Sequence, residues 1–449
     1  MDEVKYCDGG RWPQWADGMG SSLELIDPTQ DNGVPAAWAA SDESAGSSWV
    51  GVAYTGACRT VPRESELHFL LLDAGECLID NLAVRPAGSA DNLALNGDFE
   101  TTDMSRWRMT GTHENSGREA GAGVGGTACL RIAATGAGDN RANAVELDTT
   151  AAFAAGVSYT VSFDARWLRG CNVLHTRNFD YDLMHTHKLP MPSRTGTPGA
   201  RNSVWRANLG PVISGVTQSP VAPQAGAQVR VFAHISDSDG VAAAALYYAT
   251  ARPASFQTAL LWDDGAHDDG GAGDGLWAGL LPAMPDATKV LFYVQARDGQ
   301  GAVSRFPDGA PARTCLYQVR AIPASRLHVY SLIMDDDNTV ELETRPLHSN
   351  ALIDGTLVFN DSEIYYNAGL RYRGSPWQRG GWPRMFRVKI NEDEPFHGMT
   401  SFNLSRYGVR QHERTAYYVH RLMGSPSSFQ FYTRVQLNGA HYGTFEHIQ

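Results

Sequence analysis

The feature that most constrains the fold is the series of short apolar segments that fills most of the chain. Residues 66–73 (ELHFLLLD) and 158–167 (SYTVSFDARW) are strand-length examples, and Gly and Asn clusters separate such segments. Strand-length segments between turn signals are typical of β-sandwiches. The first clearly helical stretch of any length is 409–424, which ends at Gly424, where a helix commonly terminates. The sequence therefore predicts a mainly β protein.

Length and charge limit the class of protein further. A chain of 449 residues is too long for one hydrophobic core, so several domains are expected. The net charge of −12 argues against a nucleic-acid partner, because such proteins need a clustered basic surface. No run of about 18 apolar residues occurs, so we expect no transmembrane segment. The six cysteines include no CxxC pair, which disfavours a zinc ribbon and leaves disulfides or buried thiols open.

Composition and strand spacing divide the chain into five parts. They are a Gly-, Asp-, Pro- and Trp-rich segment at 1–45, a β-sandwich at 46–190, a linker at 191–207, a second sandwich at 208–320, and an α+β unit at 325–449. The first residues lack the basic start and apolar stretch of a signal peptide, and the last residues stop directly after a strand pattern. We expect a fragment of a longer protein.

The first segment resembles the closing part of a lamin-tail-type immunoglobulin-like domain. A Trp-Pro and Asp-Gly turn precedes a "SLELI" strand, and an Asp-Asn pair and a Trp follow it. The residues that carry this resemblance are Trp12, Pro13, Asp17, Gly18, Ser22 to Ile26, Asp31, Asn32 and Trp38.

The first sandwich resembles jelly-roll carbohydrate-binding modules. Residues 93–107 (LALNGDFETTDMSRW) look like the opening of such a module, and 78–84 (LIDNLAV) look like its close. Because the closing motif comes first, we expect one sandwich with permuted strands; two partial copies are the alternative. The resemblance implies a glycan partner, with Trp107 and Trp167 as candidates for stacking on sugar rings. Core packing is the other role and is favoured for both indoles, because a lone Trp in a β-sandwich is usually buried.

The second sandwich resembles a bacterial Ig-like or fibronectin-III-like spacer and contains an acidic loop at 263–277 (DDGAHDDGGAGDGLW). Carboxylates on a flexible loop suit Ca²⁺, although the bidentate Glu of an EF-hand is missing. The candidate ligands are Asp263, Asp264, Asp268, Asp269 and Asp274. A solvated Asp-Gly turn is the alternative.

Two weaker metal candidates lie in the first sandwich. Jelly rolls can bind a structural calcium ion, and the candidate ligands for such an ion in this chain are Asn96, Asp98 and Glu100. An HxH pattern occurs at His185 and His187, but no third ligand has the spacing of a zinc motif. A polar loop is therefore favoured over a zinc site there.

The last part follows the order of a protein-kinase small lobe: a strand, a Gly-rich loop, a Lys-bearing strand, a helix and a hairpin. In such a lobe the loop covers phosphates, the Lys meets their charge, and a helix Glu holds the Lys. In the strand 385–390, Arg387 and Lys389 alternate with apolar residues and so share one face. Asn438-Gly439 predicts a tight hairpin turn.

Residues 328–449 resemble the CotH family, the spore-coat-protein-H-type atypical kinases. The matching blocks include a "vgvRyRGs" motif at Ala368 to Ser375, a basic strand at 384–390, a "fxGmxxfnL" motif at Phe396 to Leu404, and an Asn-Gly hairpin at Arg434 to Gln449. The resemblance implies ATP- and Mg²⁺-dependent phosphorylation of Ser on a protein partner.

In that family the metal-binding and catalytic acids lie downstream of these motifs, so no catalytic residue is expected here. The nucleotide-binding candidates are Lys389, Arg371, Arg373 and Glu413. The expected fold is thus mainly β and multi-domain, with β-sandwich modules followed by an α+β kinase-like N-lobe.

Two functions follow from these patterns. One is a secreted or cell-surface bacterial modular protein with a CotH-like kinase, inactive in this fragment. The alternative is a non-catalytic adhesive or structural surface protein that binds glycans or matrix through its sandwiches. A carbohydrate-active enzyme is disfavoured, because neither paired carboxylates at strand ends nor a GxSxG elbow occurs.

Overall fold

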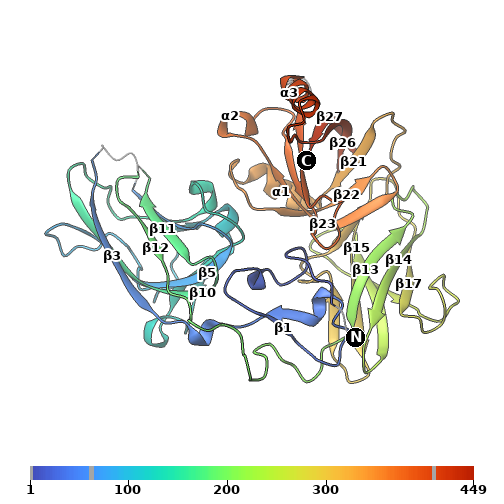
Figure 1. Cartoon of the computed structure of the whole chain (residues 1–449), viewed down its shortest axis with the longest axis horizontal. Helices are drawn as coiled ribbons and strands as arrows, with labels where there is room; N and C mark the ends of the chain where they lie inside the picture. The colour runs from blue at the N-terminus through green and yellow to red at the C-terminus, as the bar shows by residue number, and fades with distance from the viewer. Residues whose placement is uncertain (1–3, 60–64, 180, 407–410) are drawn as a thin grey trace.

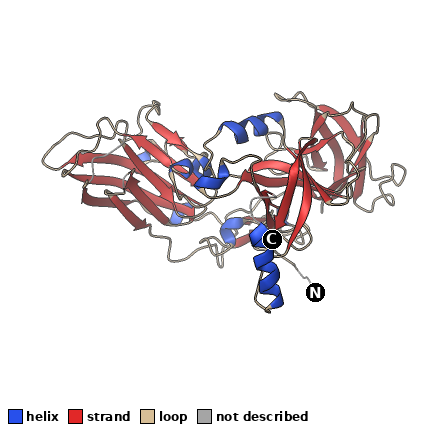
Figure 2. Ribbon diagram, turned by 90° about the horizontal axis from the view of Figure 1, so that it is seen from above, coloured by secondary structure: helices blue, strands red, loops and turns tan. Residues whose placement is uncertain are grey.

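The computed structural model describes the chain except residues 1–3, 60–64, 180 and 407–410; the side chains of 376–377 and 411–413 are likewise not described. Strands from four regions of the chain form separate sheets, with a sandwich at one end and the other units grouped beside it (Figures 1 and 2). The prediction of a mainly β protein with sandwich-like modules is confirmed.

The N-terminal segment contains a two-stranded sheet and short 3-10 turns. Its strands are β1 (Leu23–Leu25) and β2 (Trp38–Ala40), and the turns are η1 (Gln14–Ala16), η2 (Pro35–Ala37) and η3 (Ser44–Gly46). Trp12 is buried with its ring 6.5 Å from that of Trp38. Arg11 forms ion pairs with Asp393 at 3.0 Å and Glu394 at 2.9 Å. These pairs join the segment to the C-terminal unit, almost the whole length of the chain away.

The first sandwich consists of two five-stranded sheets. One is ordered β3 (Val50–Ala57), β10 (Ser158–Gly170), β5 (Gly75–Pro86), β8 (Cys129–Ala134) and β7 (Gly117–Glu119). The other is ordered β12 (Met184–Lys188), β11 (Val173–Asn178), β4 (Glu66–Leu71), β9 (Val145–Asp148) and β6 (Trp107–Met109). The 3-10 turns η4 (Gly111–His113), η5 (Val124–Gly126) and η6 (Arg141–Asn143) lie in its loops. One apolar core fills the space between the sheets.

Strands from both sides of the 93–107 motif share this core. β5 precedes the motif in sequence, yet it pairs with β10 and with β8, which both follow it. Residues 78–84, which resemble the close of a module, therefore lie in a central strand of the same sandwich as residues 93–107, which resemble its opening.

The segment 191–207 is tied to the N-terminal sheet. It contains no helix or strand, and its hydroxyl and amide groups bond to buried Glu24. Thr197 donates to that carboxylate at 2.5 Å, and the Ser203 amide donates at 2.7 Å. Burial raises the pKa of Glu24, but these hydrogen bonds outweigh it and hold the pKa below its usual value. A carboxylate of the first segment thus fixes the path of this connection.

The second sandwich has one three-stranded and one five-stranded sheet. The first is ordered β13 (Val212–Ser219), β14 (Val229–Ser236) and β17 (Leu276–Leu281). The second contains β16 (Gln257–Leu261), β15 (Val241–Ala249), β18 (Lys289–Asp298) and β19 (Val303–Phe306), with β20 (Cys315–Gln318) also paired to β18.

The C-terminal unit is a closed barrel. Its strands follow the order β21 (His328–Ile333), β22 (Ile353–Phe359), β23 (Glu363–Tyr372), β24 (Phe386–Lys389), β25 (Ser401–Arg406), β27 (Ala440–Ile448) and β26 (Gln430–Leu437). The helices are α1 (Asp336–Thr344), α2 (Pro376–Arg379) and α3 (Gln411–Leu422). Phe386 and Val388 enter the core, which confirms the predicted alternation of β24.

Two further findings concern membrane-spanning helices and the cysteines. Within the described residues, no helix is both long and apolar enough to cross a membrane. All six cysteines are free thiols, and four of them are buried: Cys58, Cys77, Cys129 and Cys315.

Candidate functional site

The outward face of the sheet β12-β11-β4-β9-β6 carries charged side chains that are largely buried. In β4, Leu67 and Phe69 point into the core, so Glu66 and His68 point outward. Across the ladder, His68 lies opposite Glu146 on β9 and Arg177 on β11. We call this surface the polar face; its outward residues are Glu66, His68, Arg108, Glu146, Asp148, His175 and Arg177.

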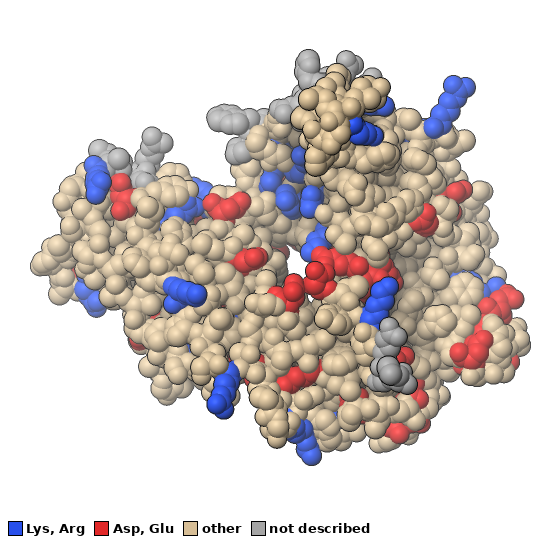
Figure 3. Space-filling model, viewed as in Figure 1, with Lys and Arg blue, Asp and Glu red and all other residues tan. Residues whose placement is uncertain are grey.

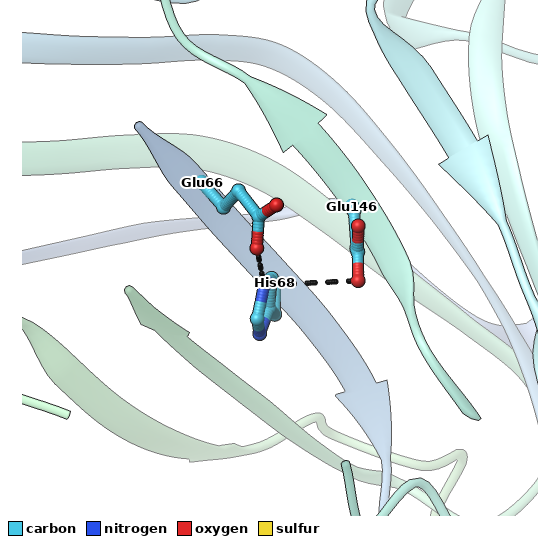
Figure 4. Close-up of side chains that lie close together, drawn as sticks. All are labelled: Glu66, His68 and Glu146. Carbon is cyan, nitrogen blue, oxygen red and sulfur yellow. Dashed lines mark hydrogen bonds and ion pairs between the residues drawn. The ribbon is translucent and has the colours of Figure 1, made fainter. Parts of the chain in front are cut away.

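A carboxylate–imidazole–carboxylate group lies at the centre of the polar face (Figure 4). His68 Nε2 lies 3.0 Å from Glu66 Oε2 and 3.9 Å from Glu146 Oε1. The three residues are 1%, 3% and 2% exposed, respectively. Buried charges of this kind need partners, because an unpaired carboxylate in a protein interior is unfavourable.

Two arginines supply those partners. Arg108 Nη2 lies 3.0 Å from Glu66 and 2.8 Å from Glu146, and its Nη1 lies 2.6 Å from Asp148. Arg141 contacts Glu66 at 2.8 Å and Glu146 at 3.5 Å. Burial lowers the pKa of Arg108, but the hydrogen bonds and charges of Glu146 and Asp148 outweigh it and raise the pKa above its usual value.

The same cluster has the composition of a metal site, because ligand atoms of Glu66, His68 and Glu146 lie within 4.8 Å of one another. Both carboxylates, however, are already paired with guanidinium groups. A divalent cation would have to displace Arg108 and Arg141. The arrangement is better suited to fixed hydrogen-bond donors and acceptors than to a metal.

Two aromatic side chains lie at the β11 end of the polar face. Tyr181 is 53% exposed, and the guanidinium of Arg177 lies 4.0 Å from the centre of its ring. The guanidinium of Arg141 lies 5.7 Å from the ring of Phe179. Aromatic surface beside converging polar groups can provide both apolar contact and orientation for a small polar ligand.

Sequence reasoning did not identify the polar face. The available signal was the charged residue at every second position of two strands, Glu66 and His68 in one and Glu146 and Asp148 in the other. The pairing of strands so distant in sequence was needed to bring these residues together.

The two tryptophans that were candidates for stacking on sugars lie in the sandwich core, the role favoured for them from the sequence. Trp107 is 5% exposed, with its ring 5.1 Å from that of Phe99. Trp167 is fully buried and donates from Nε1 to the Gly170 carbonyl at 2.9 Å. Strand alternation turns both indoles between the sheets, so neither presents a face to a ligand.

The acidic loop binds its own backbone. Asp263 accepts from the amides of Gly273 at 2.9 Å and Gly275 at 3.1 Å. Buried Asp269 accepts from the amides of Gly265 and His267, each at 3.0 Å. The other three carboxylates also have partners: Asp264 with His267, Asp268 with Arg230, and Asp274 with the amides of Gly271 and Leu276. This geometry is that of a hydrogen-bonded turn, and calcium binding stays a prediction.

The weaker metal candidates also have local partners. Asn96 donates to the carbonyls of Thr101 and Asp103, and Glu100 accepts from the Ala128 amide at 2.8 Å. The rings of His185 and His187 are stacked 4.3 Å apart. In the same strand pair, His175 bonds to Thr186 at 2.8 Å.

The nucleotide-binding candidates lie on the outside of the barrel. Arg371 on β23 is directly opposite Arg387 on β24, and burial together with the charges of Arg379 and Arg387 lowers the pKa of Arg371 to about 10. Lys389 is half exposed and lies 3.5 Å from Glu392. Arg373 bonds to Ser405. Glu413 belongs to α3, but its side chain is outside the described residues.

A cavity of about 840 Å³ lies where the two sandwiches and the barrel meet. Acidic side chains gather around the hollow between the modules (Figure 3). Arg252 pairs with Asp335 at 2.9 Å, and Arg313 pairs with Asp354, so ion pairs join the second sandwich to the barrel here. Burial, and then the charge of Glu341, raise the pKa of Glu114 at the edge of the first sandwich.

Part of the first sandwich is similar to a known protein family. Residues 91–185 match the family described as "Carbohydrate binding domain", so this part of the chain is similar to that family. The match includes β6, β9 and β11, which carry most of the polar face. No curated protein matches the chain.

Two solved structures show a remote similarity. One is the purple acid phosphatase PPD1 from yellow lupin (Lupinus luteus), with 7% identity over 69% of this chain and 43% of that one, and a TM-score of 0.19. The other comprises the N-terminal eight Ig domains of Down Syndrome Cell Adhesion Molecule, with 9% identity over 79% and 49%, and a TM-score of 0.16. The chain thus spans less than half of each structure.

Proposed function

We propose that the first sandwich binds a glycan through the polar face. The observation that carries this proposal is a buried ion network on an outward sheet surface, built largely from strands inside the segment similar to carbohydrate-binding domains. An adhesive role for the whole protein, in a secreted or cell-surface bacterial setting, belongs with this proposal.

The chemistry of the polar face suits sugar hydroxyls. Each hydroxyl both donates and accepts a hydrogen bond, and the exposed part of the face offers the Asp148 carboxylate as an acceptor next to the guanidinium donors of Arg108 and Arg141. Arg108 and Arg141 hold the two buried carboxylates in place, so little reorganisation is needed when a ligand binds. Tyr181 adds exposed aromatic surface at one edge.

A panel of immobilised polysaccharides tests the proposal with the full chain. We expect retention on at least one polymer, and we expect Tyr181→Ala to weaken it about tenfold or more because apolar contact at the edge is lost. Trp262→Ala is the matched control, since Trp262 is an exposed aromatic residue on the second sandwich. Equal loss in both variants, or no retention on any polymer, would contradict the proposal.

A second candidate is the ATP-dependent Ser phosphorylation implied by the CotH resemblance. The observation in its favour is the opposed pair Arg371 and Arg387, whose like charges a phosphate would relieve. If the barrel binds ATP and Mg²⁺, Lys389→Ala and Arg371→Gln should each reduce binding of a fluorescent ATP analogue. Lys188→Ala, an exposed lysine on β12, is the control. Unchanged binding in both barrel variants would remove this candidate.

A further inference from the structure

One guanidinium of the polar face, that of Arg177, has no polar side-chain partner among the residues that the structure describes. Arg177 is 5% exposed, and its Nε is enclosed without a hydrogen-bond acceptor from those residues. Within the described part of the chain, its side chain has no ion pair, whereas Arg108 and Arg141 on the same face each contact two or more carboxylates. Arg177 is therefore a buried positive charge that no side chain of the described residues pairs.

The groups around Arg177 leave the hydrogen-bonding edge of its guanidinium available to a ligand. The ring of Tyr181 lies 4.0 Å from the guanidinium carbon and covers one face of the group. His68 and Met184 lie opposite Arg177 on the neighbouring strands, and His68 Nδ1 also lacks a partner among the described residues. His175, two residues along the same face, is bonded to Thr186.

This arrangement is unfavourable for folding alone. A buried charge without a partner carries a desolvation penalty that stacking on one aromatic ring offsets only in part. A planar oxyanion in the plane of the guanidinium would supply two parallel charge-assisted hydrogen bonds. A carboxylate is planar, and a sulfate, although tetrahedral, can also turn two of its oxygens toward the edge of a guanidinium.

We propose that the glycan bound at the polar face is acidic, and that Arg177 recognises its carboxylate or sulfate group. The inference rests on the proposed glycan-binding function and adds the chemical class of the ligand. The neutral part of the sugar lies over the ion network toward Arg108, and Tyr181 stacks on the face of the Arg177 guanidinium while the anion binds its edge.

The test uses the full chain and two matched pairs of polymers. Polygalacturonate and its methyl ester differ in the carboxylate, and dextran sulfate and dextran differ in the sulfate. We expect the anionic member of one pair to bind at least about tenfold more tightly than its neutral partner, with affinity falling as salt is raised. The pair that responds identifies the anion.

Two variants separate recognition from general charge. Arg177→Gln should abolish the preference for the anionic polymer, and Arg177→Lys should restore it in part. Arg201→Gln is the matched control, because Arg201 also stacks on an aromatic ring, Trp205, at 4.1 Å, but lies outside the polar face. Since the Arg177 side chain has no hydrogen-bond or ion-pair partner among the described residues, its replacement by Gln should leave the melting temperature unchanged or raise it.

Three outcomes would overturn the inference. Equal binding of anionic and neutral polymers would remove the acidic ligand and keep the glycan-binding function. A preference that survives Arg177→Gln, or that is lost equally in Arg201→Gln, would remove the role of Arg177. A lower melting temperature for Arg177→Gln would assign the residue to stability instead. Absence of binding to these polymers and to the whole panel would remove both proposals.

Discussion

Replacing Arg108 by Met tests whether the ion network maintains the polar face. Arg108 contacts Glu66, Glu146 and Asp148 at 2.6–3.0 Å, and the first two carboxylates are almost fully buried. Met keeps much of the aliphatic stem of Arg108, so the change removes mainly the charge and its hydrogen bonds.

The expected loss of stability depends on the interactions that the two buried carboxylates keep in the Arg108→Met variant. Breaking a buried ion pair by removing one partner costs about 3–5 kcal/mol. Here the Arg108 side chain is 41% exposed, and Arg141 still contacts both carboxylates, so the expected loss is about 2–3 kcal/mol. For a sandwich of this size, that corresponds to a fall in melting temperature of about 5–10 °C.

Scanning calorimetry of the full chain at several pH values provides the assay. Without Arg108 the two buried carboxylates lose part of the positive charge that offsets their burial, and acidic conditions, which neutralise carboxylates, lessen the effect of that loss. The difference in melting temperature between the variant and the parent protein should therefore be largest near pH 7 and become smaller toward pH 4. Arg85→Met, at an exposed position of β5, is the control. A shift at pH 7 no larger than that of the control would refute the reasoning.

Three further predictions concern other parts of the molecule. Burial lowers the pKa of His113 to about 4, so the folded sandwich binds its proton less readily than the unfolded chain, and stability should fall by about 3 kcal/mol between pH 6.5 and 4; His113→Gln should flatten this dependence in thermal melts. Asn143 donates to the His348 carbonyl at 3.0 Å and accepts from the Asn350 amide at 2.6 Å, so Asn143→Ala should separate the calorimetric transitions of sandwich and barrel; a single unchanged transition would contradict this. Asp269→Ala should destabilise the second sandwich by about 2 kcal/mol, while a chelator should lower its melting temperature only if the acidic loop binds calcium.

The sandwiches were predictable because strand signals are local. Alternation within segments such as 385–390 reports which side chains face a core, and β24 follows that pattern. The sequence favoured core packing for Trp107 and Trp167 without fixing it, because an aromatic residue on a strand can also form a platform for a ligand. Only the strand order turned both inward.

The polar face and the barrel closure depend on contacts between distant segments. Glu66 meets Asp148 across the β4–β9 pair, and the barrel closes where β21 pairs in parallel with β26. Local periodicity carries no information on such pairings. That the Arg177 side chain has no hydrogen-bond partner among the described residues likewise depends on what the two neighbouring strands place beside it.

Hydrogen–deuterium exchange of the full chain tests the central claim most directly, with and without a polysaccharide that the panel identifies. The account predicts slower exchange on ligand addition in residues 66–71, 145–148 and 173–178, the strands that form the polar face. Protection confined to the opposite sheet of the sandwich, or to the barrel, would contradict it.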